Sequence, residues 1–249
     1  MNVLVTGGGT TAPIDDVRTI TNLSSGRFAA SIAESCLSQG AQVWHVHSPT
    51  AQVPLVRWAR FDLDAREPDV ELDRLRRLHD DWKAVRGRLH LVPSRTGTVA
   101  DYSETLRHLL TSQPIDIAFL AMAVSDYEPV PLSGKISSDD DLLVLKCHRT
   151  PKVIRFVRDW APSIYLVGFK LLSRASIGDL LDEAESAGRA NRADLTVAND
   201  LQTLVAGQHT VHLVRAGHPP ETLEPGHDLA DRLVDRVLSW TRSRDASRG

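Results

Sequence analysis

The chain begins with Val3-Leu4-Val5-Thr6-Gly7-Gly8-Gly9-Thr10-Thr11, in which an apolar run leads directly into three glycines. Such an apolar run is typical of a buried strand. Glycines at the end of a strand let the backbone approach a ligand closely, because no Cβ stands in the way. The stretch therefore predicts a buried strand followed by a loop that could face a ligand.

A helix start follows this loop. Asn22-Leu23-Ser24-Ser25-Gly26 precedes a helical pattern whose apolar positions run from Phe28 to Leu37, and Gly40 closes it. Small polar residues are typical of a helix N-cap, and glycine is typical just beyond the last turn. A glycine-rich loop that leads to a helix N-terminus directs N–H groups and the positive end of the helix dipole at one point, which suits phosphate.

The three glycines alone do not decide between a phosphate loop and a tight turn without a ligand. Their spacing matches neither Gly-x-Gly-x-x-Gly nor the P-loop pattern Gly-x-x-x-x-Gly-Lys-Ser/Thr. The segment 22–26 favours a ligand, because it adds a carboxamide, two hydroxyls and a flexible backbone at the helix start.

Alternating strand and helix patterns predict an α/β fold. A strand at residues 41–46 completes a β-α-β unit, which is normally right-handed with parallel strands. Further strands are expected at residues 89–92, 115–121, 142–145, 164–168 and 194–200, with a hairpin at 209–214 and 221–223, and helices at 98–110, 151–160, 177–189 and 229–240. We predict a Rossmann-like, mostly parallel sheet with helices on both faces and a small β-hairpin.

The chain of 249 residues is expected to form a single domain, 1–249. A charged stretch at about 62–88 has leucines and Trp82 at helical spacing, and it predicts a solvated helical insertion. Residues 241–249 are polar and are expected to form a tail.

Composition excludes several classes of protein. Apolar residues make up 42% and charged residues 24%, as in soluble globular proteins. The net charge of −3 argues against a general nucleic-acid surface, and no apolar run is long enough to span a membrane. Cys36 and Cys147 offer neither a disulfide framework nor a Cys-x-x-Cys metal pair. The chain starts directly with a strand and shows no secretory signal, so a reducing cytoplasm is expected.

Histidines do not predict a metal site. His209 and His212 point to opposite faces of one expected strand. His45 and His47 share a face, but no third ligand is spaced nearby.

The motifs around the first loop closely resemble those of the phosphopantothenoylcysteine synthetase family. They are Gly8-Gly9-Thr10, then Pro13-Ile14-Asp15-x-Val17-Arg18, then Asn22-x-Ser24-Ser25-Gly26-Arg27. Further similarities extend over nearly the whole chain, at 121–127, 135–136, 151–154, 169–170 and 197–199. The resemblance implies an enzyme that joins 4′-phosphopantothenate to cysteine during coenzyme A synthesis.

The position of Asp126 suits contact with a ligand, independently of the family resemblance. It follows the strand expected at 115–121, and ligands of open parallel sheets bind beyond the carboxyl ends of the strands. Capping of a loop is its alternative role. The resemblance implies that Asp126 contacts the nucleotide and that Met122 and Ala123 contact it through their backbones. It also implies that Lys135 neutralises phosphate and transition-state charge.

Other site residues are likewise implied by the resemblance. The nucleotide pocket would also include Pro151, Lys152, Val153, Ile154 and Phe169. Substrate-binding roles fall to Gly8, Ser24, Gly26 and Asn199. Asn22 resembles the family asparagine needed for turnover of the acyl intermediate, and with Lys135 it is a candidate catalytic residue.

The chemistry implied by the family requires a nucleoside triphosphate, because a carboxylate does not condense with an amine in neutral water. Phosphopantothenate attacks the α-phosphate, and cysteine then attacks the resulting acyl-nucleotidylate. Mg²⁺ is expected to bind mainly through the triphosphate oxygens, with no metal site made by protein side chains. ATP and CTP both remain open. Family members are homodimers in which a neighbour's residues complete the substrate pocket, so a dimerisation element is expected.

Several positions depart from the family pattern. Ala29 replaces a glycine, Leu172 replaces an acidic residue, and Ala187 and Asn191 replace lysines. Phosphate contacts could be rerouted through Arg189 and Arg192, which are nearby in sequence. Residues 158–162 and 169–171 look more like the free-standing form of the family.

Two other readings stay open. One is a catalytically lapsed relative that still binds nucleotide or pantothenate. The other is an NAD(P)-dependent oxidoreductase, which would need a Tyr-x-x-x-Lys pair; Tyr127 has no lysine four residues further on.

Overall fold

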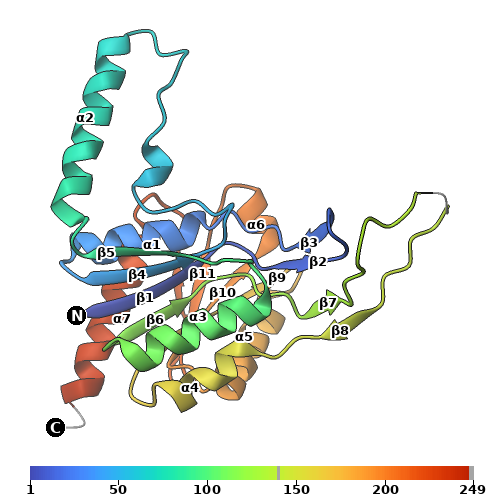
Figure 1. The fold of residues 1–249 in the computed structure, drawn as a ribbon. Coiled ribbons are helices and arrows are strands. Elements are labelled where there is room, and N and C mark those ends of the chain that lie inside the picture. Colours follow the sequence, from blue (N-terminus) through green and yellow to red (C-terminus); the bar gives the residue numbers. More distant parts are fainter. Residues whose placement is uncertain (139–140, 247–249) are drawn as a thin grey trace.

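The computed structural model describes residues 1–138 and 141–246. Eight strands form one sheet in the order β12-β11-β10-β9-β6-β1-β4-β5 (Figure 1). Their bounds are β1 Asn2–Gly7, β4 Gln42–His47, β5 Leu89–Pro93, β6 Ile117–Leu120, β9 Tyr165–Leu172, β10 Leu195–Asp200, β11 Val211–Val214 and β12 Glu221–Leu223.

The strand order is that of a doubly wound sheet. From β5 to β10 every neighbouring pair is parallel, and β11 and β12 add an antiparallel hairpin at one edge. The chain proceeds outward from β1 to β4 and β5, then returns to β6 on the other side of β1. This reversal creates a crevice beyond the carboxyl ends of β1 and β6, where ligands bind in such sheets. The predicted Rossmann-like fold is confirmed.

Helices cover both faces of the sheet. The helices are α1 Arg27–Ser38, α2 Pro68–Val85, α3 Val99–Ser112, α4 Val157–Trp160, α5 Ile177–Asn191, α6 Leu201–Val205 and α7 Leu229–Ala246, with 3-10 turns at η1 Val56–Trp58 and η2 Val153–Phe156. Alternate side chains of β1 serve the two faces: Val3 and Val5 pack with α1 and α7, and Leu4 packs with α3 and α4. Two buried apolar layers therefore hold the sheet between the helices.

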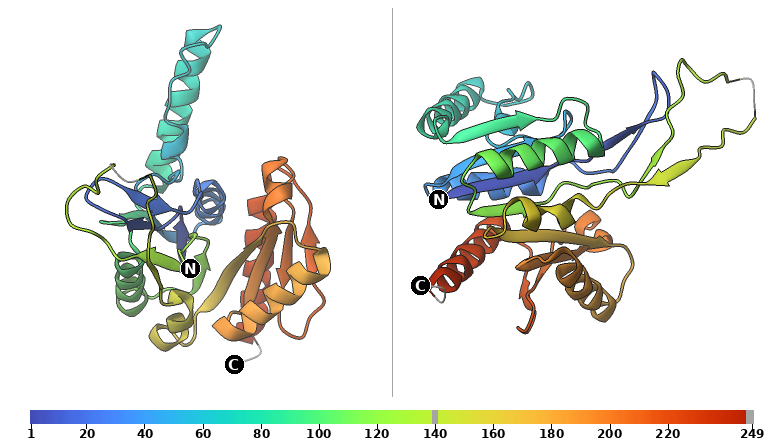
Figure 2. Two further views of the ribbon diagram at one scale, coloured as in Figure 1. Left: turned by 90° about the vertical axis from the view of Figure 1, so that its right-hand side faces the viewer. Right: turned by 60° about the horizontal axis from the view of Figure 1, so that its bottom comes forward.

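Two short hairpins form an arm that extends beyond the sheet (Figures 1 and 2). One joins β2 Thr11–Pro13 to β3 Thr19–Thr21, and the other joins β7 Tyr127–Pro129 to β8 Cys147–Arg149. The strand predicted at 142–145 is wrong: Leu142, Leu143 and Val144 are exposed, and pairing begins only at Cys147. An apolar run suggested a strand there, but among the described residues no strand pairs with residues 142–145.

A buried carboxylate ties the two hairpins of the arm together. Asp15 Oδ2 accepts hydrogen bonds from the Ile136 amide at 3.0 Å and the Arg18 guanidinium at 2.5 Å. Its Oδ1 accepts from the amides of Val17 at 2.9 Å and Arg18 at 2.7 Å. Burial raises the pKa of Asp15, but these hydrogen bonds outweigh it and lower the pKa to about 2. Asp15 is therefore ionised at neutral pH and holds residues 134–136 against the turn at 14–18.

Helix α2 projects from the rest of the molecule (Figure 2). Pro68 starts the helix, and Asp69 and Glu71 in its first turn suit the positive end of its dipole. Its inner face touches the body through Trp82 and Val85. A helix was predicted within residues 62–88, and the structure places its start at residue 68.

The polar tail predicted at 241–249 is wrong as far as residue 246, because α7 continues to Ala246; residues 247–249 lie outside the described part. Two contacts explain the extension. Thr241 is buried, and the Arg244 guanidinium lies 5.0 Å from the centre of the Tyr165 ring and donates to the Ser163 carbonyl at 3.0 Å. In the part of the chain that the structure describes, no helix combines the length and hydropathy needed to cross a membrane.

His45 makes the stability of the fold depend on pH. The side chain is fully buried, and neither ring nitrogen has a hydrogen-bond partner among the residues that the structure describes. Burial, followed by the charges of His47 and Arg57, lowers its pKa from 6.5 to about 3. The unfolded chain takes up a proton near pH 6.5 and the folded chain does not. The stability that comes from keeping His45 neutral is therefore complete above pH 6.5. As the pH falls from 6.5 toward 3, the unfolding free energy decreases by about 1.4 kcal/mol per pH unit.

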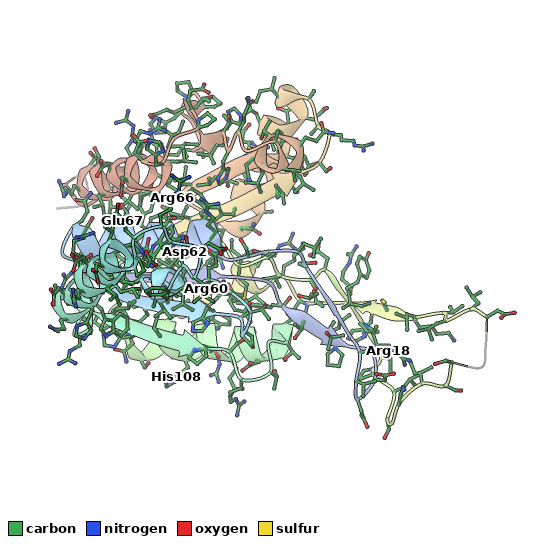
Figure 3. All side chains as sticks on the ribbon, turned by 90° about the horizontal axis from the view of Figure 1, so that it is seen from above. Arg18, Arg60, Asp62, Arg66, Glu67 and His108 are labelled. Carbon is green, nitrogen blue, oxygen red and sulfur yellow. The ribbon has the colours of Figure 1, made fainter. Side chains whose placement is uncertain are left out.

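We expect His45→Leu to flatten this part of the pH dependence. Between pH 7 and 5.5 the wild type should lose about 1.3 kcal/mol more unfolding free energy than the variant, measured by urea denaturation. His108, which Figure 3 labels, is exposed, and His108→Gln is the matched control that should follow the wild type. Parallel curves for wild type and His45→Leu would contradict this assignment.

Candidate functional site

The glycine loop after β1 crosses to the end of β6 and meets Asn22 there. The Ala123 amide donates to the Gly8 carbonyl at 2.9 Å, and the Thr10 amide donates to the Ala123 carbonyl at 3.0 Å. Asn22 Nδ2 donates to the same Ala123 carbonyl at 3.2 Å. Gly8, Asn22 and Ala123, predicted separately as site residues, therefore converge at the crevice where the strand order reverses.

Gly8 and Gly26 are required by close packing around the loop. Both have positive φ, 91° for Gly8 and 70° for Gly26. A Cβ on Gly8 would lie 2.1 Å from Ser48 Oγ, and a Cβ on Gly26 would lie 2.9 Å from the Ala51 Cβ. Neither glycine can therefore be replaced without displacing the segment that follows β4.

The start of α1 has no side-chain cap. Gly26 is its N-cap residue, and the nearest hydroxyl, Ser25 Oγ, accepts only a 3.4 Å hydrogen bond from the Arg27 amide. Ser24 is half-buried beside it. First-turn amides without a cap, together with the helix dipole, suit an anionic ligand.

Asn199 lies at the carboxyl end of β10, and Phe169 lies in the second half of the neighbouring strand β9, paired with Val197. The Phe169 ring contacts Phe28 of α1 edge-to-face at 6.3 Å, and Phe28 contacts His209 at 4.6 Å. Burial and the nearby charge of Arg27 lower the pKa of His209, so its imidazole is neutral at pH 7. From the sequence, His209 stands out only as one of a possible metal pair with His212, and the alternation of the strand makes that pair unlikely. No sequence signal places it against α1, because the contact joins residues far apart in the chain.

Asp126 and Lys152 form an ion pair at the next part of the rim. The Thr150 amide donates to the Asp126 carbonyl at 3.0 Å and fixes the backbone there. Both charged side chains remain about half exposed. If a nucleotide hydroxyl or amine bound Asp126, the Lys152 ammonium would lie beside that nucleotide.

Other predicted nucleotide contacts are constrained by the fold. The Val153 side chain is buried in the core, and Ile154 packs near Gly168. Pro151 precedes η2 and does not begin a regular helix as predicted. The Met122 amide already donates to Thr6 Oγ1 at 3.2 Å, and the Ala123 amide to Gly8. A backbone contact from Met122 to a ligand would therefore have to use its carbonyl group, and the Ala123 carbonyl already accepts from Thr10 and Asn22.

Lys135 lies on the arm and does not join the glycine loop of its own chain. Its neighbours Gly134 and Ile136 are hydrogen-bonded to Asp16 and Asp15. Residues 134–136 are thereby held against the turn at 14–18, and Figure 3 shows Arg18 of that turn far out on the arm. The structure thus separates Lys135 from Asn22 within one chain.

Two sequence departures lie away from this site. Ala187 and Asn191 are in the last turns of α5, which runs back to the amino end of the sheet. Arg189 and Arg192 are paired there with Glu185 at 2.5 Å and Asp159 at 2.6 Å. These arginines therefore lie at the opposite end of the strands from the crevice of their own chain, and the structure does not bring them to it.

The strand order and the crevice at the carboxyl rim define a class of protein: a doubly wound α/β protein with an uncapped helix start beside its topological switch point. The sequence matches the family described as the DNA/pantothenate metabolism flavoprotein C-terminal domain over residues 1–64 and 91–240. The unmatched interval contains α2.

Individual relatives agree with this match. Phosphopantothenate–cysteine ligase 1 of Oryza sativa subsp. japonica is 31% identical over 223 residues, which cover 80% of this chain and 68% of that protein. The solved structure of the DNA/pantothenate metabolism flavoprotein from Streptococcus pneumoniae has a TM-score of 0.76 at 28% identity, covering 96% of this chain and 99% of that one.

A longer relative carries this region as one part of a larger protein. The coenzyme A biosynthesis bifunctional protein CoaBC of Thermococcus kodakarensis is 29% identical over 238 residues, covering 94% of this chain but 50% of that protein. The chain thus spans about half of that relative. On these matches, the chain belongs to the DNA/pantothenate metabolism flavoprotein C-terminal domain family, which includes phosphopantothenate–cysteine ligases.

Proposed function

We propose that the chain ligates 4′-phosphopantothenate to L-cysteine through an acyl-nucleotidylate, in coenzyme A biosynthesis. One observation carries the proposal: Gly8, Asn22 and Ala123 converge beside the uncapped start of α1, in a chain whose relatives include proteins named phosphopantothenate–cysteine ligase. The same crevice is bordered by Asp126, Lys152, Phe169 and Asn199.

The reaction has two steps. The phosphopantothenate carboxylate attacks the α-phosphorus of ATP or CTP, forming the acyl-nucleotidylate and releasing pyrophosphate. The cysteine amine then attacks the acyl carbon and releases the nucleoside monophosphate, with loss of a proton. Mg²⁺ would neutralise the triphosphate by binding mainly to its oxygens. Catalysis of this kind depends mostly on positioning and charge neutralisation.

The chain's own residues supply that positioning. The hydrogen bond to Ala123 holds the Asn22 carboxamide in place, and its second N–H can stabilise the oxyanion that forms on the acyl carbon. First-turn amides of α1 and the backbone around Gly8 and Gly26 face the phosphorylated ligands. Asn199 would orient phosphopantothenate, and Phe169 would pack on bound ligand.

A homodimer would explain the position of Lys135. The arm carries exposed apolar side chains, including Val130, Leu142 and Val144, which a second copy could cover. In a two-fold dimer, an arm that reaches the neighbouring crevice would deliver Lys135 to the partner's nucleotide. The free thiols of Cys36 and Cys147 suit a reducing compartment such as the cytoplasm.

Mixed dimers test the delivery of Lys135 to the partner. Asn22→Asp and Lys135→Gln chains should each lose at least about 100-fold in ligase activity. Co-folded at equal amounts, they should recover about a quarter of wild-type activity, because half of the two-fold dimers then contain one intact site. No recovery in mixtures shown by native mass spectrometry to contain hetero-dimers would contradict transfer between subunits.

The proposed activity is tested directly with phosphopantothenate, cysteine, Mg²⁺ and either ATP or CTP. We expect pyrophosphate release that depends on phosphopantothenate, and formation of phosphopantothenoylcysteine. Absence of both products with either nucleotide, in a protein that still binds phosphopantothenate, would favour the lapsed binding relative. Reduction of NAD(P) would favour the oxidoreductase.

A further inference from the structure

A pocket of about 600 Å³ lies between the start of α1 and the segment that follows β4. None of its lining residues is among the residues of the proposed active site. The lining residues are Arg27, Thr50, Ala51, Gln52, Val53, Val56, Arg57, Trp58, Ala59 and Arg60. Ligand pockets commonly have volumes of this order.

The pocket adjoins the proposed active site at the start of α1, because Arg27, the first residue of that helix, lines it. The Gln52 amide donates to the Ser25 carbonyl at 2.8 Å, and Ala51 packs against Gly26. Ser48 lies where Gly8 and Ala51 meet, and its hydroxyl is buried without a hydrogen-bond partner among the described residues. The segment 48–52 therefore packs directly on the glycine loop and the start of α1, and the same helix start borders both this pocket and the crevice.

The charge of the pocket is positive and largely uncompensated. Three arginines line it and no acidic residue does. Arg57 is neutralised, because it pairs with Glu34 at 2.5 Å and donates to Ser31 Oγ at 3.0 Å. Arg57 thereby clamps the segment to α1. Arg27 and Arg60 make no ion pair within the described residues, so two guanidinium groups remain for a ligand.

Helix α2 holds the outer wall of this pocket. Arg74 donates to the carbonyls of Trp58 at 3.0 Å and Arg60 at 2.5 Å. Glu71 in turn accepts from Arg74 and from the Asp62 amide at 3.0 Å. The Arg74 hydrogen bond, the Asp62 amide and then the Arg74 charge outweigh burial and lower the pKa of Glu71 to about 2. Figure 3 shows Arg60 and Asp62 close together in this region. The helix that the family match leaves out thus positions Arg60.

We propose that this pocket binds the β- and γ-phosphates of the nucleoside triphosphate and the pyrophosphate that they become. The inference rests on the proposed function. Arg27 and Arg60 bind the phosphate oxygens, the α1 amides bind the end nearest the α-phosphorus, and Arg74 acts as a positioning residue. When the carboxylate forms its bond to the α-phosphorus, the bond between that phosphorus and the bridging oxygen breaks. The electron pair leaves with pyrophosphate, whose added charge these arginines stabilise.

Binding of inorganic pyrophosphate to the full-length chain, measured by calorimetry with Mg²⁺ present, tests this proposal without requiring turnover. Arg60→Gln and Arg27→Gln should each weaken binding by about 10- to 100-fold, as expected for loss of a charge-assisted hydrogen bond. Arg77→Gln is the matched control, because Arg77 is an exposed arginine of α2 outside the pocket. It should bind pyrophosphate as the wild type does.

Steady-state kinetics separate the possible sources of the phosphate group. We expect Arg60→Gln to raise the KM for nucleotide and weaken product inhibition by pyrophosphate, with an unchanged KM for phosphopantothenate. A raised KM for phosphopantothenate with unchanged pyrophosphate binding would overturn the proposal and assign the pocket to the 4′-phosphate. Unchanged pyrophosphate binding in both Arg60→Gln and Arg27→Gln would also overturn it.

Arg74→Gln distinguishes positioning from direct contact. It should weaken pyrophosphate binding less than Arg60→Gln does, and combination with Arg60→Gln should add little, because both act through one guanidinium. Fully additive losses would show that Arg74 does not act through Arg60. Wild-type chain that binds pyrophosphate in this pocket but makes no phosphopantothenoylcysteine would refute the ligase activity and leave the polyphosphate site standing.

Discussion

Asn22→Asp should release pyrophosphate in its first turnover and then stall, with the rate of phosphopantothenoylcysteine formation reduced by about 100- to 1,000-fold. Loss of a single oxyanion-stabilising donor has an effect of this size in other enzymes. Two consequences of the substitution act together here. The carboxylate cannot donate to the Ala123 carbonyl, as Asn22 Nδ2 does at 3.2 Å. It also places negative charge beside an acyl group that becomes an oxyanion.

Rapid-quench analysis should show the acyl-nucleotidylate accumulating to nearly one equivalent per site. Gln113→Glu is the matched control, because Gln113 caps the end of α3 remote from the crevice; this variant should turn over normally. If Asn22→Asp formed the amide product at the wild-type rate, Asn22 would have no part in breakdown of the intermediate. If pyrophosphate were not released even once, Asn22 would act in the first step instead.

Gly8→Ala should lower the unfolding free energy by about 2–5 kcal/mol and abolish ligase activity. At φ +91° a side chain is strained, which costs about 1–2 kcal/mol. The added methyl would also lie 2.1 Å from Ser48 Oγ and 2.8 Å from the Ala51 Cβ. Relief of such overlap by backbone movement costs about 1–3 kcal/mol more. The loop would then shift away from Ala123, and the crevice would lose its shape.

Gly40→Ala separates the two contributions. Gly40 has a similar φ of +81°, but nothing lies within 4 Å of the position that its Cβ would take. Urea denaturation should therefore show only the strain of about 1–2 kcal/mol, and activity should persist. Equal losses for both variants would mean that the contact between Gly8 and Ser48 does not constrain the loop.

The sheet could be predicted from the chain because its signals are local. Buried parallel strands are continuous apolar runs, and the expected strand at 115–121 corresponds to β6 Ile117–Leu120. Thr98 caps α3, with its hydroxyl accepting from the Asp101 amide at 3.3 Å, and the predicted helix began there. The expectation failed at residues 142–145, where the same kind of apolar run has no strand beside it and its side chains are exposed. Apolar composition alone does not supply a partner strand.

The site was only partly accessible to such reasoning. Asn22 and Gly8 were identified from contiguous motifs, and the structure brings them to Ala123. Arg60 and His209 carried no motif. Their relevance arises because Arg74 fixes the backbone at residue 60 and because Phe28 meets the His209 ring across the rim.

By itself, the sequence determined the α/β architecture, the glycine loop and the family motif, because hydrophobic period, turn chemistry and short motifs act over neighbouring residues. Only the tertiary structure decided that Lys135 lies away from Asn22 on an extended arm, and that Arg27 and Arg60 share a pocket supported by α2. These arrangements depend on contacts such as Asp15 with Ile136 and Arg74 with Trp58, between residues distant in the chain. The free energy of such contacts comes from buried hydrogen bonds and ion pairs that exist only once the sheet has brought the loops together.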